Sequence, residues 1–291
     1  MSRRNATLLG FSAVLLWSLL AFFTVGSAPV PPLQLNAMTF AVGGLTGLVW
    51  VMARGGIGQL RQVPLKVYAF GAAGLFGYHF FYFSALRLAP AAEAGLIAYL
   101  WPLLIVLLSG LLPGERLRAG HILGAVLAFG GAALLIAKGR PGGDGTAALG
   151  YGFALACALI WSGYSVLSRR LGSVPTSAVA VYCVLTALLS APAHFYMETT
   201  VWPLSLGNWL AVLGLGLGPV GIAFFTWDIG VKRGDIQLLG TLSYAAPLLS
   251  TLVLIVTGHA TPTSRLLFAA ILIAAGAALA ARAAARQVNS D

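Results

Sequence analysis

The sequence is poor in charged residues. Only 8% of its 291 residues are Asp, Glu, Lys or Arg, whereas an average soluble domain carries about 25%. At the same time 59% of the residues are hydrophobic, and the mean hydropathy is +0.92. A soluble protein of this length needs charged side chains to cover its surface. The composition therefore excludes a soluble globular protein and predicts a polytopic integral membrane protein.

Acidic residues and cysteines are also scarce. Seven Asp and Glu stand against 17 Lys and Arg, which gives a formal net charge of +10. A clustered basic face would indicate nucleic-acid binding, but these residues stand in ones to threes between apolar runs, so we expect no nucleic-acid partner. Cys157 and Cys183 both fall inside apolar runs. We interpret them as small buried residues and expect no disulfide, metal site or cofactor.

Ten apolar runs are long enough to cross the roughly 30 Å of hydrocarbon in a bilayer. They lie near 6–25, 33–53, 67–86, 91–112, 119–137, 148–168, 176–197, 206–229, 235–256 and 263–281. The predicted fold class is therefore all-α, with ten transmembrane helices. The first run, which follows Arg3 and Arg4, also resembles a cleavable signal peptide. Its length of about twenty residues and its counterpart later in the chain favour a retained span.

The distribution of Lys and Arg among the loops predicts the orientation. Thirteen basic residues lie at the termini and in the even-numbered loops, against four in the odd-numbered loops. The positive-inside rule then places both termini in the cytoplasm, which an even number of spans also requires. The four on the opposite side are Arg87, Lys138, Arg140 and Arg265.

The chain repeats its pattern at a shift of 143 to 145 residues. Trp17-Ser18 in the first span falls on Trp161-Ser162 in the sixth, and residues 99–104 in the fourth fall on 244–249 in the ninth. We divide the chain into two five-helix repeats, residues 1–140 and 146–291. Because five is odd, the second repeat is inverted in the membrane. Inverted repeats are typical of transporters that alternate access around a midplane site.

Aromatic residues gather near the middle of several spans, although Trp and Tyr ordinarily favour the membrane interfaces. In the third span Tyr78, His79 and Tyr82 project from adjoining helix faces, and a histidine at that depth is costly unless it faces a cavity or a partner. Simple packing is the alternative for each residue. We predict a midplane cavity lined by Trp17, Ser18, Tyr78, His79, Tyr82, Tyr99, Trp101, Trp161, Ser162, Phe224, Trp227, Ser243 and Tyr244.

Two prolines stand near the middle of the fourth and ninth spans. Pro102 and Pro247 have no N–H to donate, which frees the carbonyls of Ala98 and Ser243 four residues earlier. Free carbonyls at membrane depth are tolerated where they line a cavity, and there they can accept hydrogen bonds from a substrate ammonium. We predict kinks with a gating role at both prolines. Kinks that only let the helices pack are the alternative.

The few acidic residues lie away from the midplane. Glu93 falls in the first turn of the fourth span, where a carboxylate favours the helix N-terminus, and Asp228 stands four residues before Lys232, which predicts an ion pair. The central layer also lacks Lys and Arg. Such a layer suits a large neutral or zwitterionic substrate that binds by stacking and apolar burial. Without a central carboxylate, we expect facilitated movement down the substrate gradient.

The two five-span halves, the Trp-Ser pair in the first span of each and the Pro-Leu-Leu in the fourth resemble the EamA branch of the drug/metabolite transporter superfamily. The run 78–82 (Tyr-His-Phe-Phe-Tyr) and the run 99–102 (Tyr-Leu-Trp-Pro) are further similar to the YddG-type aromatic amino acid exporters of bacterial inner membranes. The resemblance implies export of aromatic or large neutral amino acids by a multi-pass protein of the inner membrane, working as a monomer or weak homodimer.

Other functions are considered beside this one. A broad exporter of drugs or metabolites from the same superfamily is the alternative within transporters. An intramembrane enzyme would need a nucleophile with its base, or paired carboxylates, at one depth, and the sequence offers neither. A structural scaffold in the bilayer gives no reason for an inverted repeat. The sequence therefore predicts a transporter and not an enzyme.

Overall fold

The computed structural model describes residues 1–136, 147–258 and 261–288. Lys138, Arg140 and the expected boundary between the two repeats lie outside the described residues. The helices are α1 (Arg3–Trp17), α2 (Leu20–Gly26), α3 (Pro32–Ala53), α4 (Ile57–Arg61), α5 (Leu65–Leu88), α6 (Ala91–Ala98), α7 (Trp101–Ser109), α8 (Ala119–Ile136), α9 (Ala147–Arg170), α10 (Ala178–Met197), α11 (Leu206–Leu215), the π-helix η1 (Gly216–Ile222), α12 (Ala223–Arg233), α13 (Ile236–Leu242), α14 (Ala245–Val256) and α15 (Ser264–Val288).

These elements form the ten expected spans, because four of the spans consist of more than one helical segment: α1–α2, α6–α7, α11–η1–α12 and α13–α14. Within the described ranges, seven stretches are both long and apolar enough to cross a membrane, and the helices over 93–109 and 119–134 are shorter apolar ones. The remaining span, α5, is 24 residues long. The predicted all-helical polytopic membrane fold is confirmed.

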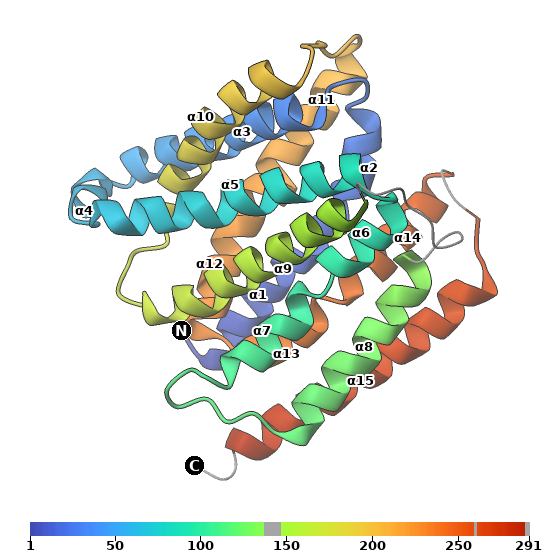
Figure 1. Ribbon diagram of the computed structural model, residues 1–291. Helices are drawn as coiled ribbons and strands as arrows, with labels where there is room; N and C mark the ends of the chain where they lie inside the picture. The colour runs from blue at the N-terminus through green and yellow to red at the C-terminus, as the bar shows by residue number, and fades with distance from the viewer. Residues whose placement is uncertain (137–146, 259–260, 289–291) are drawn as a thin grey trace.

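The helices run side by side through one bundle, and the chain enters and leaves it at the same end (Figure 1). The start of α1 and the end of α15 lie at this end, together with α4 and the connection from α7 to α8, to the left in Figure 1. We call it the termini end. The opposite end holds the end of α2, the start of α6 and the connection from α10 to α11.

The main packing pairs join one helix of each half. They include α3 with α10, α8 with α15, α5 with α9, α1 with α12, and α7 with α13. When the two halves are exchanged, the pairs α3–α10, α8–α15 and α7–α13 are each mapped onto a pair of the same two spans. The pair α5–α9, which joins the third and sixth spans, is mapped onto the pair α12–α1, which joins the eighth and first spans. This pattern is that of a two-fold arrangement, as the inverted repeat predicts.

Glycines allow the α8–α15 pair to pack backbone against backbone. A Cβ atom at Gly124 would lie 2.5 Å from the carbonyl oxygen of Gly276, and one at Gly276 would lie 2.4 Å from the carbonyl oxygen of Gly124. Any side chain at either position would force the helices apart. Small residues at such crossings are a usual means of helix association in membranes.

Ion pairs hold both ends of the bundle. At the termini end, Glu115 pairs with Arg3 at 3.2 Å and also with Arg169, so the connection from α7 to α8 is tied to α1 and α9. At the opposite end, Glu198 pairs with Arg87 of α5 and, at 2.9 Å, with His194 of α10. Each buried carboxylate thus links the first half of the chain to the second.

Two predictions about acidic residues are confirmed. Asp228 and Lys232 form the expected ion pair at 2.9 Å, and the Asp228 carboxylate also accepts a hydrogen bond from Thr176 at 2.7 Å. Glu93 lies in the first turn of α6, where its carboxylate accepts a hydrogen bond from the hydroxyl of Tyr151. Neither carboxylate belongs to the aromatic centre of the bundle described below.

Candidate functional site

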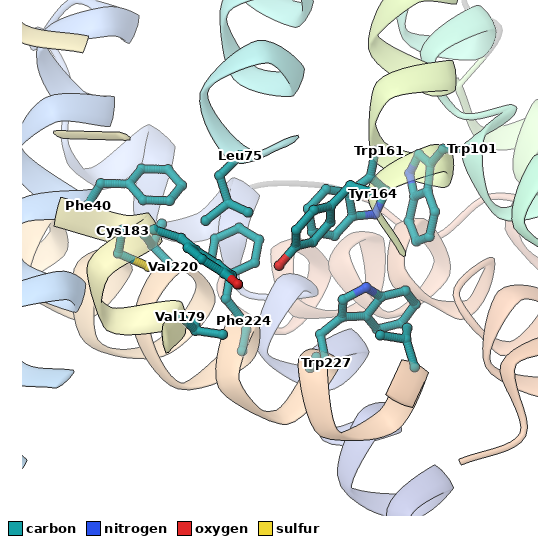
Figure 2. Packing of buried hydrophobic residues seen from close by; sticks show 14 of the residues in the cluster. Phe40, Leu75, Trp101, Trp161, Tyr164, Val179, Cys183, Val220, Phe224 and Trp227 are labelled. Carbon is teal, nitrogen blue, oxygen red and sulfur yellow. The ribbon is translucent and has the colours of Figure 1, made fainter. Parts of the chain in front are cut away.

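Aromatic rings from both halves of the chain meet where α1, α7, α9 and α12 come together. The ring of Trp17 lies at the centre of this group: its centroid is 5.1 Å from Trp227, 5.8 Å from Trp161, 6.0 Å from Phe224 and 6.1 Å from Trp101. We call these five residues the aromatic cluster. Figure 2 shows Trp101 and Trp161 beside Tyr164 with Trp227 below them, Phe224 below Leu75, and Phe40 farther to the left.

Residues related by the sequence repeat touch each other here. Trp17 contacts Trp161, with ring centroids 5.8 Å apart, and the same pairing recurs at 6.3 Å between His79 and Phe224 and between Tyr99 and Tyr244. Residues on a two-fold axis meet their own counterparts, whereas residues far from the axis cannot. The axis that relates the two halves therefore runs through the predicted site residues.

A second group of rings extends from the cluster and is less buried. Tyr78 packs on Trp161 at 5.5 Å, Tyr82 stacks on Tyr78 at 6.0 Å with nearly parallel rings, and Tyr99 packs on Trp101 at 6.2 Å. These tyrosines and Trp17 are half-buried. By contrast, Trp101, Trp161, Phe224, Trp227 and Tyr244 are at most 5% exposed.

His79 joins the two groups. Its ring lies 5.1 Å from Tyr78 of the second group and 6.3 Å from Phe224 of the cluster, and it also lies 5.0 Å from Phe40. Its Nδ1 is 2.7 Å from the carbonyl oxygen of Leu75 in the same helix. A carbonyl only accepts, so Nδ1 carries the proton and Nε2 of the neutral ring is left as an acceptor. In this tautomer the half-buried His79 suits an ammonium or an indole N–H better than a carboxylate.

The hydroxyls of the three predicted site serines donate to carbonyls one turn back in their own helices. The bonds join Ser18 to Leu15 at 2.6 Å, Ser162 to Leu159 at 3.2 Å and Ser243 to Leu239 at 2.7 Å. Each hydroxyl oxygen keeps a lone pair. In this arrangement the serines can accept hydrogen bonds, but they do not offer a donor to a ligand.

The fourth and ninth spans are both interrupted just before their prolines, α6–α7 at Tyr99-Leu100 and α13–α14 at Ser243-Tyr244. The N–H of Leu103, whose usual helical acceptor is the Tyr99 carbonyl, donates instead to the Tyr244 hydroxyl at 3.0 Å. Within the described residues, the carbonyls of Ala98 and Tyr99 accept no backbone hydrogen bond.

The corresponding carbonyl in the second half is occupied. The Ser243 carbonyl accepts a hydrogen bond from the N–H of Ala246 at 3.1 Å. The expectation that Pro247 leaves this carbonyl free is therefore wrong, because the chain tightens to a three-residue turn and supplies another donor. Of the two predicted carbonyl sites, only the one before Pro102 is open.

Two acceptors that were not predicted from the sequence orient the indoles of the cluster. The indole N–H of Trp17 donates to the carbonyl of Pro219 in η1 at 3.0 Å, and that of Trp227 donates to the hydroxyl of Ser165 at 3.1 Å. The sequence did contain a signal for the first acceptor, because Pro219 is a proline inside the eighth span, where it predicts an irregular helix. Ser165 lies four residues after Trp161 and so on the same helix face.

Phe40 and Tyr164 were also missed. Phe40 of α3 stacks on Phe224 with centroids 5.5 Å apart, and Tyr164 stacks on Trp161 at 5.3 Å. Tyr164 stands three residues after Trp161, a spacing that predicts contact on a helix. Phe40 has no such local signal, because only the packing of α3 against its neighbours brings it to the cluster.

Groups that bind metals are not assembled in the described part of the chain. No three His, Cys, Asp or Glu side chains there gather closely enough to hold an ion. Cys157 and Cys183 are buried and unpaired. The arrangement as a whole offers ring faces, ring edges and backbone carbonyls, which suit an aromatic, partly polar small molecule.

Comparisons with known proteins cover nearly the whole chain. The chain is 57% identical over 290 residues to the aromatic amino acid exporter YddG of Ancylobacter novellus, which covers 98% of this chain and 100% of that one. It is 26% identical over 270 residues to the YddG exporter of Escherichia coli K12, covering 86% and 88%. A solved crystal structure that is 56% identical superposes with a TM-score of 0.91 over 96% of this chain and 98% of that one.

The family comparison matches each half of the chain separately. The model of the EamA-like transporter family fits residues 4–137 and again residues 148–282. The duplication seen in the sequence is thus also a duplication of the family unit. The protein belongs to the EamA-like transporter family.

Proposed function

We propose that the protein exports aromatic and other large neutral amino acids, and related metabolites, across a bacterial inner membrane. The observation that carries the proposal is the meeting of repeat-related aromatic residues on the axis between the two halves. A site on that axis can be reached from either side when the halves exchange conformations. The naming of full-length relatives as aromatic amino acid exporters supports the substrate class.

The residues at the site match the parts of such a substrate. An aromatic side chain can pack on Trp17, Trp101 and Tyr78, and each aromatic pair contributes about 0.5–1.5 kcal/mol beyond burial. The carbonyls of Ala98 and Tyr99 and the Nε2 of His79 are acceptors for the ammonium. The N-terminal end of α7, which begins at Trp101, carries the positive end of a helix dipole and suits the carboxylate.

Orientation and assembly follow from the same reasoning. The excess of Lys and Arg at the termini end supports placing both termini in the cytoplasm. The helices of one chain supply all five residues of the aromatic cluster, which supports a single chain as the transport unit, alone or in a weak homodimer. Facilitated movement down the substrate gradient is the expected mode, because the rings of the cluster surround no carboxylate.

Transport by purified protein in liposomes tests the proposal. We expect release of labelled Trp, Phe and Tyr faster than from empty vesicles, and a loss of about tenfold or more for Trp101→Ala, which removes a contact surface of the substrate. Trp50→Ala is the matched control, since Trp50 is 55% exposed on the outer face of α3. Equal release with and without protein would contradict the proposal.

Two further measurements define the substrate and the coupling. Competition by a panel of drugs and metabolites separates a selective amino acid exporter from the broad exporter, which would accept bulky compounds without an amino acid group. An imposed pH gradient should leave the flux unchanged. A flux that follows the gradient, and stops following it in His79→Gln, would replace facilitated movement by proton coupling through this imidazole.

A further inference from the structure

We infer that Tyr99 and Tyr244 are paired positioning residues whose hydroxyls take turns in capping the half-helix of the opposite repeat, one in each access state. The inference rests on the alternating access of the proposed function and adds to it the contact that distinguishes the two states. It arises from a hydrogen bond that breaks the symmetry between the halves.

In the described structure Tyr244 makes this cap. Its hydroxyl oxygen accepts the hydrogen bond from the N–H of Leu103, 3.0 Å away, in the first turn of α7. The first N–H groups of a helix have no partner within the helix, and inside a membrane no water is present to bond with an unpaired one. Tyr244 is 0% exposed and packs against Phe129 of α8 with centroids 5.9 Å apart. The second half of the chain thus completes a helix of the first half.

The reciprocal bond is not made. A shift of 145 residues maps Tyr244 onto Tyr99 and Leu103 onto Leu248, in the first turn of α14. Among the described residues, the Tyr99 hydroxyl forms no hydrogen bond, and Tyr99 is only half-buried. Its ring nevertheless lies 6.3 Å from that of Tyr244, across the axis between the halves. Tyr99 is therefore placed to cap α14 once the halves exchange conformations.

The carbonyls at the two helix interruptions also differ between the halves: they are open in the first half, and in the second half the Ser243 carbonyl is occupied. Where Tyr244 holds the Leu103 N–H, the Tyr99 carbonyl loses its helical donor and stays open, together with that of Ala98. In the other half the Ser243 carbonyl is occupied by Ala246. Exchange of the tyrosine caps would occupy the carbonyl before Pro102 and free that of Ser243 before Pro247. The tyrosines then decide which side of the site offers acceptors to a substrate ammonium.

Distances between spin labels report the balance between the two states without any substrate. One pair of labels replaces Arg116 and Ser173 at the termini end, and the other replaces Ala28 and Thr261 at the opposite end; the 145-residue shift maps one pair onto the other, and all four residues are exposed. Cys157 and Cys183 are first replaced by Ala, and this background must retain the wild-type thermal stability.

We expect opposite shifts from the two conservative variants. Tyr244→Phe removes the cap present in the described structure and should lower the population of this state about fivefold, the value of one net hydrogen bond. Tyr99→Phe removes the cap of the other state and should raise the described population by a similar factor. The double variant should return to near the wild-type balance. Tyr196→Phe, at a position 92% exposed, is the matched control.

Shifts in the same direction, or unchanged distances in both variants, would overturn the exchange, since a merely structural role predicts a loss of stability and no change of sign. The double variant distinguishes the exchange from a merely structural role, because two independent structural defects would add instead of cancelling. Opposite shifts in a protein that moves no aromatic amino acid would leave the exchange standing and remove only the substrate class.

Discussion

The two halves of the chain share one sequence pattern, but their backbones differ at matching places. The first span is interrupted after Trp17, whereas its counterpart α9 continues without a break past Trp161. In the eighth span seven residues form η1, whereas the corresponding third span is the continuous helix α5. The difference shows that two halves of similar sequence can adopt different conformations. Alternating access requires that the two halves differ in this way in each state.

A single residue difference accounts for the divergence between the third and eighth spans. Pro219 of η1 corresponds to Gly74 of α5. At Gly74 a Cβ would lie 2.5 Å from the ring of Tyr164, so glycine allows α5 to pack closely on α9. Pro219 cannot donate a backbone hydrogen bond, and its ring pushes the preceding turn apart. The carbonyl of Pro219 then becomes the acceptor for the Trp17 indole, beside the break in the first span.

The largest expected effect compares the repeat-related tryptophans. Trp161→Ala should lower the free energy of unfolding by about 3–5 kcal/mol, because Trp161 is 3% exposed and lies against Trp17, Trp101 and Trp227. Trp17→Ala should cost less, since Trp17 is half-buried. Thermal unfolding of both variants in detergent measures the difference. Equal losses would mean that the halves contribute equally to the packing of the cluster.

A second change makes the halves more alike. His79→Phe places in the third span the residue that stands at 224 in the eighth. The phenyl ring keeps the contacts with Phe40 and Tyr78, so the loss of the bond to the Leu75 carbonyl should lower stability by only about 1 kcal/mol. The Nε2 acceptor is lost as well. We expect export of labelled Trp to drop about tenfold, the cost of one hydrogen bond to a charged group. Wild-type export in this variant would remove His79 from the site.

The smallest effect concerns the bond between the two irregular spans. Trp17→Phe should cost about 1 kcal/mol by removing the hydrogen bond to the Pro219 carbonyl. In a Pro219→Ala background the same change should cost nothing, because a regular helix would supply that carbonyl with a backbone donor. A double-mutant cycle of unfolding free energies measures this coupling. Additive losses would show that the two irregularities arise independently.

Much of the fold was predictable from the sequence because its causes are local. A run of about twenty apolar residues crosses a bilayer wherever it stands in the chain, so the spans from α1–α2 to α15 were found with correct order and number. The register of the repeat also predicted that Trp17 and Trp161 occupy equivalent depths. Their contact at 5.8 Å follows from equal depth and the position of the axis.

The details of the site were decided by the tertiary structure. Nothing near Trp17 in the sequence indicates that its indole N–H bonds to a residue 202 positions away, or that Leu103 is capped by a hydroxyl 141 positions away. The sequence treats the carbonyls before Pro102 and Pro247 alike, yet one is open and the other occupied.

The physical reason for this division is the solvent. In a bilayer hydropathy alone selects which segments become helices, and the backbone groups of a regular helix are satisfied within the segment. Where a helix is interrupted, as at Tyr99 and Ser243, the backbone N–H and carbonyl groups that lose their helical partners cannot bond to water. They bond instead to the groups that the neighbouring spans provide. That choice depends on how the two halves are packed. The sequence therefore determined the spans, their inverted symmetry and the aromatic residues at the centre, while the packing of the halves decided which hydrogen bonds break that symmetry.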